Sequence, residues 1–510
     1  MGIIIRQSIK GTVVNYIGSF IGFIMTFFIM MRFLTAEELG LTRVLLDAAL
    51  LFAGLAQMGT NSSIIRFYPH FKNEKKRDHG FFFWTLLIPF IGFFIVLFFF
   101  FVFKEPIGRY FSKEAQLFVD YYNYVIPLAF FIMYIAVFEC NSNVLMRIVI
   151  PKFIREVAIR LCLIVVYLLY GFKILTLNQF VVFFCVVYGI ALLLNIIYLF
   201  SLQRVSLKPD INFINKPLRR DMSNYTFFMV VVVLSSTITP MLNSFFISAK
   251  LGLAFTGIFT VATYIATVVE IPYRSLGAIT QPHISRAVKE KKFSEADVLC
   301  KSVSLHQLLI GSFVFYFIWI NIDVIFQILP KGDFYSAGKW AVFFIAFSRL
   351  FNSVFSVGAT VLSYSKYYYY SLFFTIGLTA MAILLNLWWI PVWGINGATL
   401  ATVVSFIVYY LALLLFVYIK LKISPFSLNQ LKIVALLGGL FLLNYLWCNT
   451  ITHLGNSLNI NELAFTVIDR LLCSAVMLVI GVIAVYQLKF SAEVNQLADR
   501  CIKRFFGIGI

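Results

Sequence analysis

Apolar residues fill this chain in long runs, and short polar segments separate the runs from one another. A run of about 20 apolar residues can cross the hydrocarbon core of a bilayer as an α-helix, which satisfies all its own backbone groups. We therefore predict an all-α membrane protein with about fourteen spanning helices. Their approximate limits are 11–34, 40–66, 80–103, 118–146, 153–170, 180–203, 223–249, 255–281, 299–321, 338–362, 371–390, 396–419, 430–448 and 464–487.

The composition agrees with this class. Hydrophobic residues make up 61% of the 510 residues, only 12% are charged, and the mean hydropathy is +0.92. A soluble protein would be roughly one quarter charged. The seven cysteines are scattered without metal-ligand spacing, so we expect no metal site, no disulfide framework and no bound cofactor.

The formal charge of +19 is best explained by membrane topology. With the N-terminus in the cytoplasm, about 30 of the 41 basic residues fall on the cytoplasmic side and about 8 on the external side. This bias predicts that both termini are cytoplasmic. Because topology already accounts for the excess of basic residues, nucleic acid is not expected as a partner. The segment 488–510 mixes basic and apolar residues and is expected to lie on the cytoplasmic leaflet as an interfacial tail.

Polar residues recur on one face of the first two helices. At helical spacing, the second helix carries a stripe of Arg43, Asp47, Gly54, Gln57 and Asn61. The first helix offers a matching face of Asn15, Ser19, Gly22 and Thr26. Such a stripe must face protein or water in a membrane. It predicts either a water-accessible cavity or polar packing between helices, and the sequence leaves both open.

A short repeat divides the chain. Asn15-Tyr16 and Asn224-Tyr225 open the first and seventh helices, and Leu39-Gly40-Leu41 and Leu251-Gly252-Leu253 precede the second and eighth. Parallel repeats of this kind predict a lobe at 1–220, a second lobe at 221–422 and two additional helices within 423–487. The eighth and tenth helices repeat the polar stripe, with Thr260, Thr263, Thr267, Glu270 and Arg274 on one, and Arg349 and Asn352 on the other.

The charges inside the helices are the main functional candidates. Arg349 is predicted near mid-membrane, where an unpaired charge costs about 2.5–3.5 kcal/mol, so a ligand phosphate, a water-filled lumen or a partner carboxylate must offset it. Asp47 and Glu270 each lie four residues from an arginine of the same helix, which favours intrahelical ion pairs, with ion coupling as the alternative. Glu139 has no basic residue one turn away and is therefore the better candidate for coupling to Na+ or H+.

Several chemistries lack their residue patterns. The sequence has no complete phosphate-binding loop and no metalloprotease or nucleophile-elbow motif, and every predicted loop is short. A transporter without enzymatic activity is therefore expected.

Two segments carry a family resemblance, namely Phe33-Leu34-Thr35-Ala36-Glu37-Glu38-Leu39-Gly40 and Asn61-Ser62-Ser63-Ile64-Ile65-Arg66-Phe67-Tyr68. With the helix layout, they resemble the polysaccharide-flippase branch of the multidrug/oligosaccharidyl-lipid/polysaccharide exporter superfamily. The resemblance implies two lobes in a V around a cationic lumen that open alternately to either side of a bacterial inner membrane. It also implies an undecaprenyl-pyrophosphate-linked oligosaccharide as substrate, and membrane lipids and other polysaccharide-assembly membrane proteins as partners.

On this analogy Arg43, Arg274 and Arg349 would contact the pyrophosphate, because guanidinium groups offer planar bidentate donors. Two other functions remain in competition. A cation-coupled drug antiporter of the same superfamily would favour an acidic lumen, for which Asp47, Glu139 and Glu270 are the candidates. A membrane glycan polymerase or ligase is disfavoured by the short loops.

Overall fold

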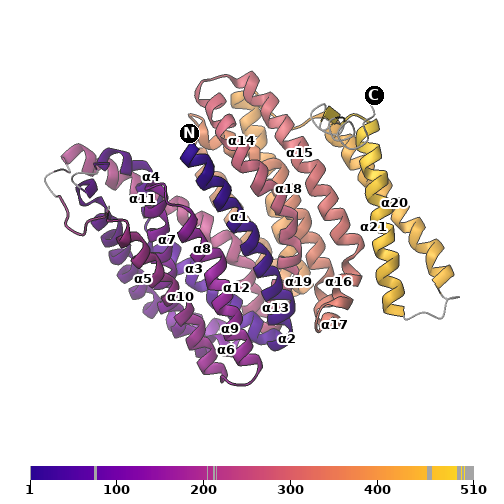
Figure 1. Ribbon diagram of the computed structural model, residues 1–510, viewed down its shortest axis with the longest axis horizontal. Helices are drawn as coiled ribbons and strands as arrows, with labels where there is room; N and C mark the ends of the chain where they lie inside the picture. Colours follow the sequence, from indigo (N-terminus) through magenta and orange to yellow (C-terminus); the bar gives the residue numbers. More distant parts are fainter. Residues whose placement is uncertain are drawn as a thin grey trace. The chain divides into compact units, whose positions relative to one another are not determined.

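The structure is a computed structural model, and it describes residues 2–73, 77–203, 205–210, 213, 215–455, 462–490, 495–496 and 499. Within these residues every regular element is helical (Figure 1), which confirms the predicted all-α class. Most of the predicted interfacial tail at 488–510 lies outside the described residues.

The chain divides into two compact units, which are described separately. Unit 1 comprises Met1–Val261, Leu329–Lys331 and Thr379–Ala398; unit 2 comprises Ala262–Ile328, Gly332–Leu378 and Thr399–Ile510. This division follows packing rather than helix order, so the lobes predicted at 1–220 and 221–422 stay a prediction.

Unit 1 is built mainly from the first helices of the chain. They are α1 (Gly2–Ile24), η1 (Met25–Met30), α2 (Met31–Phe33), α3 (Ala36–Ala56), α4 (Thr60–Phe71), η2 (Arg77–Gly80), α5 (Phe81–Phe111), α6 (Gln116–Tyr121), η3 (Tyr122–Tyr124), α7 (Val125–Val144), α8 (Val149–Phe153), η4 (Ile154–Ala158), α9 (Ile159–Gly171), α10 (Leu177–Ser201), α11 (Lys216–Ile238), η6 (Thr239–Met241), α12 (Leu242–Leu251) and the start of α13 (Leu253–Thr267).

Unit 2 contains the end of α13 and most of the later helices. Its elements are η7 (Val268–Glu270), α14 (Ile271–Lys289), α15 (Phe293–Ile320), α16 (Ile322–Ile328), α17 (Gly332–Tyr335), η8 (Ser336–Gly338), α18 (Lys339–Tyr364), both ends of α19 (Tyr370–Leu421), α20 (Leu428–Gly455) and α21 (Glu462–Gln487).

Among the described residues, eleven helices are long and apolar enough to cross a membrane, so the predicted number of fourteen is not confirmed. Helices nevertheless cover every predicted stretch. The stretches 153–170 and 223–249 are interrupted by the short elements η4 and η6, and α19 runs through two predicted spans. Gly394 bends α19 between those spans with φ 57°, a conformation that glycine adopts without steric cost.

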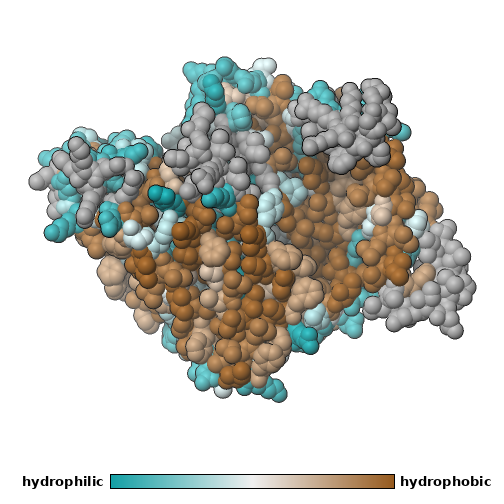
Figure 2. Space-filling model, viewed as in Figure 1, coloured by the Kyte–Doolittle hydropathy of each residue, from teal (hydrophilic) through white to brown (hydrophobic). Residues whose placement is uncertain are grey.

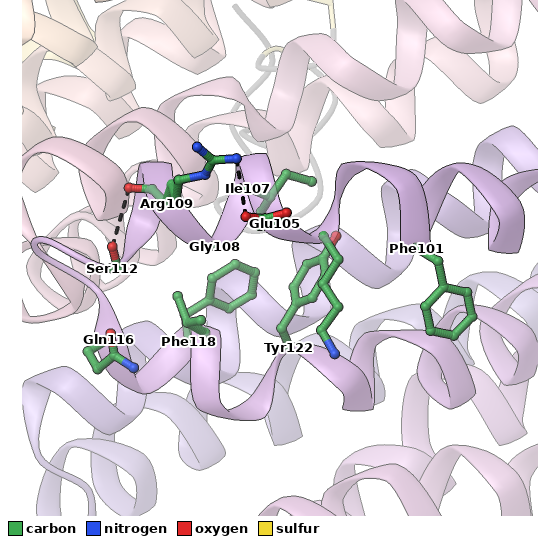
Figure 3. Close-up of a pocket in the computed structure, with 11 residues that line it drawn as sticks. Phe101, Glu105, Ile107, Gly108, Arg109, Ser112, Gln116, Phe118 and Tyr122 are labelled. Atoms are coloured by element: carbon green, nitrogen blue, oxygen red, sulfur yellow. Dashed lines mark hydrogen bonds and ion pairs between the residues drawn. The ribbon is translucent and has the colours of Figure 1, made fainter.

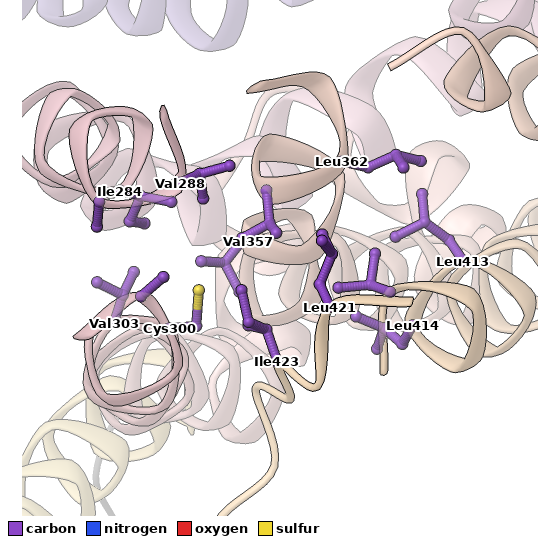
Figure 4. Close-up of a cluster of buried hydrophobic side chains, with 14 of the residues drawn as sticks. Ile284, Val288, Cys300, Val303, Val357, Leu362, Leu413, Leu414, Leu421 and Ile423 are labelled. Atoms are coloured by element: carbon purple, nitrogen blue, oxygen red, sulfur yellow. The ribbon is translucent and has the colours of Figure 1, made fainter. Parts of the chain in front are cut away.

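Large apolar side chains cover the outside of the spanning helices. Phe98 is 65% exposed and Trp388 is 74% exposed, values that a lipid environment explains. Figure 2 shows apolar side chains along the middle of the helices and polar side chains gathered near their ends. Inside unit 2, aliphatic residues from α14, α15, α18 and α19 pack into one cluster (Figure 4), with Ile284, Cys300, Val357 and Leu413 nearly inaccessible.

The segment that carries the first half of the family resemblance is a helix cap. The hydroxyl of Thr35 accepts the backbone N–H of Glu38 at 3.2 Å, and the Glu38 carboxylate accepts the backbone N–H of Thr35 at 2.8 Å. This reciprocal capping box satisfies two backbone donors that would otherwise have no partner at the start of α3. It fixes where the polar stripe of α3 begins.

The two segments of the predicted repeat meet in unit 1. A Cβ on Gly40 of α3 would overlap the backbone carbonyl of Leu253, and a Cβ on Gly257 of α13 would overlap the carbonyl of Ala36. The two helix starts therefore cross backbone to backbone, as small residues allow in membrane proteins. Gly40, the glycine of the first repeat segment, is therefore a packing requirement of this crossing.

Candidate functional site

The predicted ion pair of α3 is present. Arg43 Nε donates to Asp47 Oδ2 at 2.8 Å, and the Asp47 side chain is only 3% exposed while that of Arg43 is 23% exposed. The spacing of four residues places the two groups on adjacent turns of one helix face. Asp47 is thereby buried with a cationic partner, as a carboxylate in a membrane helix requires.

Glu139 has a basic partner that its own helix does not supply. Arg155 Nη1 lies 2.8 Å from Glu139 Oε2, and the Glu139 side chain is 11% exposed. Arg155 belongs to η4, which comes after α7 in the chain, so its approach depends on how two helices pack rather than on spacing within one. No periodicity in the sequence links Arg155 to Glu139, and sequence reasoning therefore missed this residue.

The Glu139–Arg155 pair belongs to a larger charge network. Arg155 also bonds Glu156 at 3.1 Å, and Glu156 bonds Arg160 at 3.1 Å. Arg160 donates a further hydrogen bond to the backbone carbonyl of Gly18 in α1. Arg155 and Glu156 lie in η4, a π-helix, which is a rare element that occurs frequently at functional sites. Together, Glu139, Arg155, Glu156 and Arg160 are called the η4 network.

Arg155→Ala is expected to lower the free energy of unfolding by about 1–3 kcal/mol, because it leaves the Glu139 carboxylate buried without its cation. Because the Arg155 side chain is 46% exposed, the loss in the free energy of unfolding should be smaller than for a fully buried ion pair. Adding Glu139→Gln should restore most of the loss, because a neutral amide needs no counterion. Melting temperatures in one detergent measure this. Arg147→Ala, at an exposed arginine before α8, is the control. Equal stability of all variants would contradict the prediction.

Unit 2 brings together two of the three predicted arginines at one carboxylate. Arg349 Nη1 of α18 lies 2.9 Å from Glu270 Oε1, and Arg274 Nη2 of α14 lies 3.4 Å from Glu270 Oε2. The Glu270 side chain is 9% exposed, whereas those of Arg349 and Arg274 are 34% and 66% exposed. Two guanidinium groups therefore share one buried carboxylate, and this group of three is called the Glu270 cluster.

The backbone changes its winding at Glu270, near the end of the candidate span Leu253–Arg274. The 3-10 helix η7 separates α13 from α14, and Pro272 lies at the start of α14. A short 3-10 stretch inside a longer helix often marks a functional hinge. The Glu270 cluster thus lies where the predicted eighth helix changes its winding.

Asn352 of the predicted stripe has a specific partner. Tyr410 of α19 is buried and donates its hydroxyl to Asn352 Oδ1 at 2.6 Å. Ser353, beside it on α18, donates to the backbone carbonyl of Arg349 at 2.8 Å. These bonds fix the segment of α18 that presents Arg349.

The other predicted stripe residues mostly bond within their own helices. Thr260 donates to the Thr256 carbonyl and Thr267 to the Thr263 carbonyl, both at 2.7 Å. Asn61 Nδ2 donates to Gln57 Oε1 at 2.9 Å. Asn15 is half-buried on α1. The threonine bonds agree with the packing alternative for Thr260 and Thr267. The buried Asn61 Oδ1 and Thr26 Oγ1 have no hydrogen-bond partner among the described residues.

Each predicted charged residue thus has an observed position. Arg43 and Asp47 form one pair in unit 1, Glu139 belongs to the η4 network in the same unit, and the Glu270 cluster lies in unit 2. In the part of the chain that the structure describes, no group of three or more His, Cys, Asp or Glu side chains could hold a metal ion.

The fold is similar to those of solved membrane transporters. A structure titled lipid II flippase MurJ, inward closed conformation, matches with a TM-score of 0.67 and 13% identity, covering 92% of this chain and 98% of that one. An inward-facing multidrug resistance MATE family transporter of the MOP superfamily gives 0.55 and 16%, covering 82% and 98%. A mutant of the Vibrio cholerae MATE transporter VcmN gives 0.56 and 11%, covering 83% and 98%. At these identities the likeness concerns the fold.

Sequence comparison identifies the family. No curated protein sequence matches the chain. Residues 4–288, more than half of the chain, match the family described as polysaccharide biosynthesis protein. The chain therefore belongs to the polysaccharide biosynthesis protein family, and the eleven long apolar helices among its described residues make it an integral membrane protein.

Proposed function

We propose that this protein moves a polyprenyl-pyrophosphate-linked oligosaccharide from the cytoplasmic to the outer leaflet of a bacterial cytoplasmic membrane. Membership of the polysaccharide biosynthesis protein family supports a glycan-related substrate, and the likeness to a lipid II flippase supports a lipid-linked one. The observation that carries the proposal is the Glu270 cluster, in which Arg274 and Arg349 share one carboxylate.

The charge balance of the Glu270 cluster suits an anionic substrate. Two guanidinium groups face one carboxylate, so the cluster keeps a positive charge when the ion pairs are formed. Arginine binds phosphate oxygens with two parallel hydrogen bonds, and these charge-assisted bonds are about twice as strong as neutral ones. A pyrophosphate that approaches Arg349 and Arg274 can therefore replace Glu270 as their acceptor. In its absence, Glu270 keeps Arg349 paired.

The competing drug-antiporter function receives less support from the same contacts. An organic cation would need an available carboxylate, yet Asp47, Glu139 and Glu270 each hold an arginine at 2.8 to 3.4 Å. The MATE neighbours share the fold, and low identity limits the comparison to that. The named neighbours are flippases and transporters, so they give no support to a polymerase or ligase function. Their identity is compatible with a protein that is not an enzyme.

Coupling to a Na+ or H+ gradient through Glu139 is also part of the proposal. Because Arg155 already neutralises Glu139, a coupling cation would have to exchange with the guanidinium group, and the η4 network offers Glu156 as the alternative acceptor for Arg155. Glu139→Gln should then lower transport driven by a gradient and leave the gradient-free rate unchanged. Full gradient response in Glu139→Gln would exclude this role.

The test of the transport function is reconstitution of the full chain in liposomes. A fluorescent undecaprenyl-pyrophosphate oligosaccharide is placed in one leaflet, and its arrival in the other is followed by an impermeant quencher. Protein-dependent movement of this lipid, with no uptake of an organic cation, is the expected result. Uptake of the cation without lipid movement would assign the protein to the drug-antiporter function. A glycan product formed by the purified protein alone would identify a polymerase or ligase.

A further inference from the structure

A cavity of about 550 Å³ lies at the end of α5 in unit 1, and none of its lining residues belongs to the Glu270 cluster. Figure 3 shows it between the last turns of α5 and the short helix α6, with Phe118, Tyr122 and Gln116 on one side and Glu105 and Arg109 on the other. Two of its lining residues, Lys104 and Arg109, are basic, and Glu105 is acidic. Arg109 Nη2 lies 3.3 Å from Glu105 Oε1, and both side chains are largely exposed.

A second cavity of about 280 Å³ adjoins the first and is lined by apolar and aromatic side chains. Ile107, Phe118 and Tyr122 line both cavities, so these three side chains form the boundary between them. The second cavity extends between α3 and α12, where Leu51 and Phe245 contribute to its wall. The pair of cavities thus places a basic opening beside an apolar space.

Tyr122 leaves a hydrogen-bonding group unused at this boundary. The residue is 4% exposed, its ring stacks on Phe100 at a centroid distance of 4.4 Å, and its hydroxyl has no hydrogen-bond partner among the described residues. A buried hydroxyl without a partner costs about 1–3 kcal/mol, so a ligand with an acceptor oxygen at the boundary would recover this free energy.

Basic residues gather here against the general charge bias of the chain. The end of α5 is predicted on the external side, which holds few of the basic residues. Lys104 and Arg109 line the first cavity beside Glu105, and Lys250 lies 5.4 Å from the ring centroid of Tyr110, which lines the second. Arg109 pairs with Glu105, whereas no ion pair of Lys104 is found within the described residues, so Lys104 is the cation of the first cavity that an anionic ligand would meet.

We propose that these two cavities bind one anionic phospholipid of the external leaflet. Its phosphate accepts hydrogen bonds from Lys104 and from the guanidinium edge of Arg109, and an ester oxygen accepts the hydroxyl of Tyr122. One acyl chain enters the apolar cavity past Phe118. The small apolar volume fits part of an acyl chain and excludes a whole polyprenyl chain, so the ligand is a resident lipid rather than the transported one.

The test is native mass spectrometry of the full chain in detergent, titrated with phosphatidylglycerol. Phosphatidylcholine with the same acyl chains and undecaprenyl phosphate serve as comparison lipids. We expect one phosphatidylglycerol to bind at least about tenfold more tightly than phosphatidylcholine, and Lys104→Ala to weaken it about tenfold. Tyr122→Phe should weaken it about fivefold without lowering the melting temperature, because the lost hydroxyl has no partner within the described part of the protein.

Two further variants make the result specific. Lys113→Ala removes the same charge from the same helix end at a residue that does not line either cavity, and it should leave lipid binding unchanged. Leu51→Trp fills the apolar cavity and should abolish retention. Equal loss in Lys113→Ala and Lys104→Ala would overturn the head-group site, and tighter binding of undecaprenyl phosphate than of phosphatidylglycerol would overturn the choice of a resident phospholipid.

Discussion

Arg349→Ala is expected to slow transport of the lipid-linked oligosaccharide by at least about tenfold, because a charge-assisted hydrogen bond contributes about 1.5–3 kcal/mol. Arg349 is the more closely paired and less exposed arginine of the Glu270 cluster, since it lies 2.9 Å from Glu270 and is 34% exposed, whereas Arg274 lies at 3.4 Å and is 66% exposed. Arg349→Lys keeps the charge but not the planar pair of donors, so its rate should lie between those of the wild type and Arg349→Ala. Initial rates in liposomes at equal protein density measure this.

A double substitution separates anion binding from a purely structural ion pair. Arg349→Ala leaves Glu270 with Arg274 alone and should lower the melting temperature, and adding Glu270→Gln should restore it because the neutral amide needs no cation. If Arg349 binds the substrate, transport stays low in the stable double variant. Recovery of transport together with stability would show that Arg349 acts only as the partner of Glu270.

The matched control for this experiment is Arg286→Ala. Arg286 also lies in unit 2 and also pairs with an acidic residue, Glu290, at 2.7 Å, but its side chain is 78% exposed. Hydrogen bonds from Arg286 and Lys292 lower the pKa of the Glu290 carboxyl to about 2, so this pair stays charged near neutral pH. Removing it should change neither the rate nor the stability appreciably.

Gly40→Ala is expected to destabilise the protein by about 1–3 kcal/mol, although alanine ordinarily favours a helix over glycine. The added Cβ would overlap the carbonyl of Leu253, which is backbone and can yield only if α3 and α13 move apart. Gly257→Ala should act similarly through the carbonyl of Ala36. The double variant should lose less than the sum of the two, because the first substitution already separates the helices.

Gly377→Ala provides the comparison. Gly377 is likewise helical, in α19, but no atom of the described residues lies within 4 Å of a Cβ added there. Its melting temperature should equal or slightly exceed that of the wild type. A loss in Gly377→Ala as large as that in Gly40→Ala would mean that the close crossing is not the reason for the destabilisation.

The local features of this chain could be predicted because their causes lie within a few residues. The apolar runs determine where helices form, since every backbone group in lipid must be satisfied internally. The Thr35–Glu38 cap and the Arg43–Asp47 pair depend on spacings of three and four residues, which a helix converts directly into contact. Arg274 and Glu270 were predicted together for the same reason, and the structure confirms the pair at 3.4 Å.

The contacts that define the candidate site were decided by packing between helices. Glu139 meets Arg155 across two elements, and Arg349 reaches Glu270 from a helix 79 positions away in the chain. Periodicity gives the face of a residue along its own helix but not the neighbour that this face meets. The same limit applies to Gly40 and Leu253: the sequence by itself determined that their segments repeat, and only the tertiary structure decided that the repeats cross, because a close backbone approach depends on two surfaces at once.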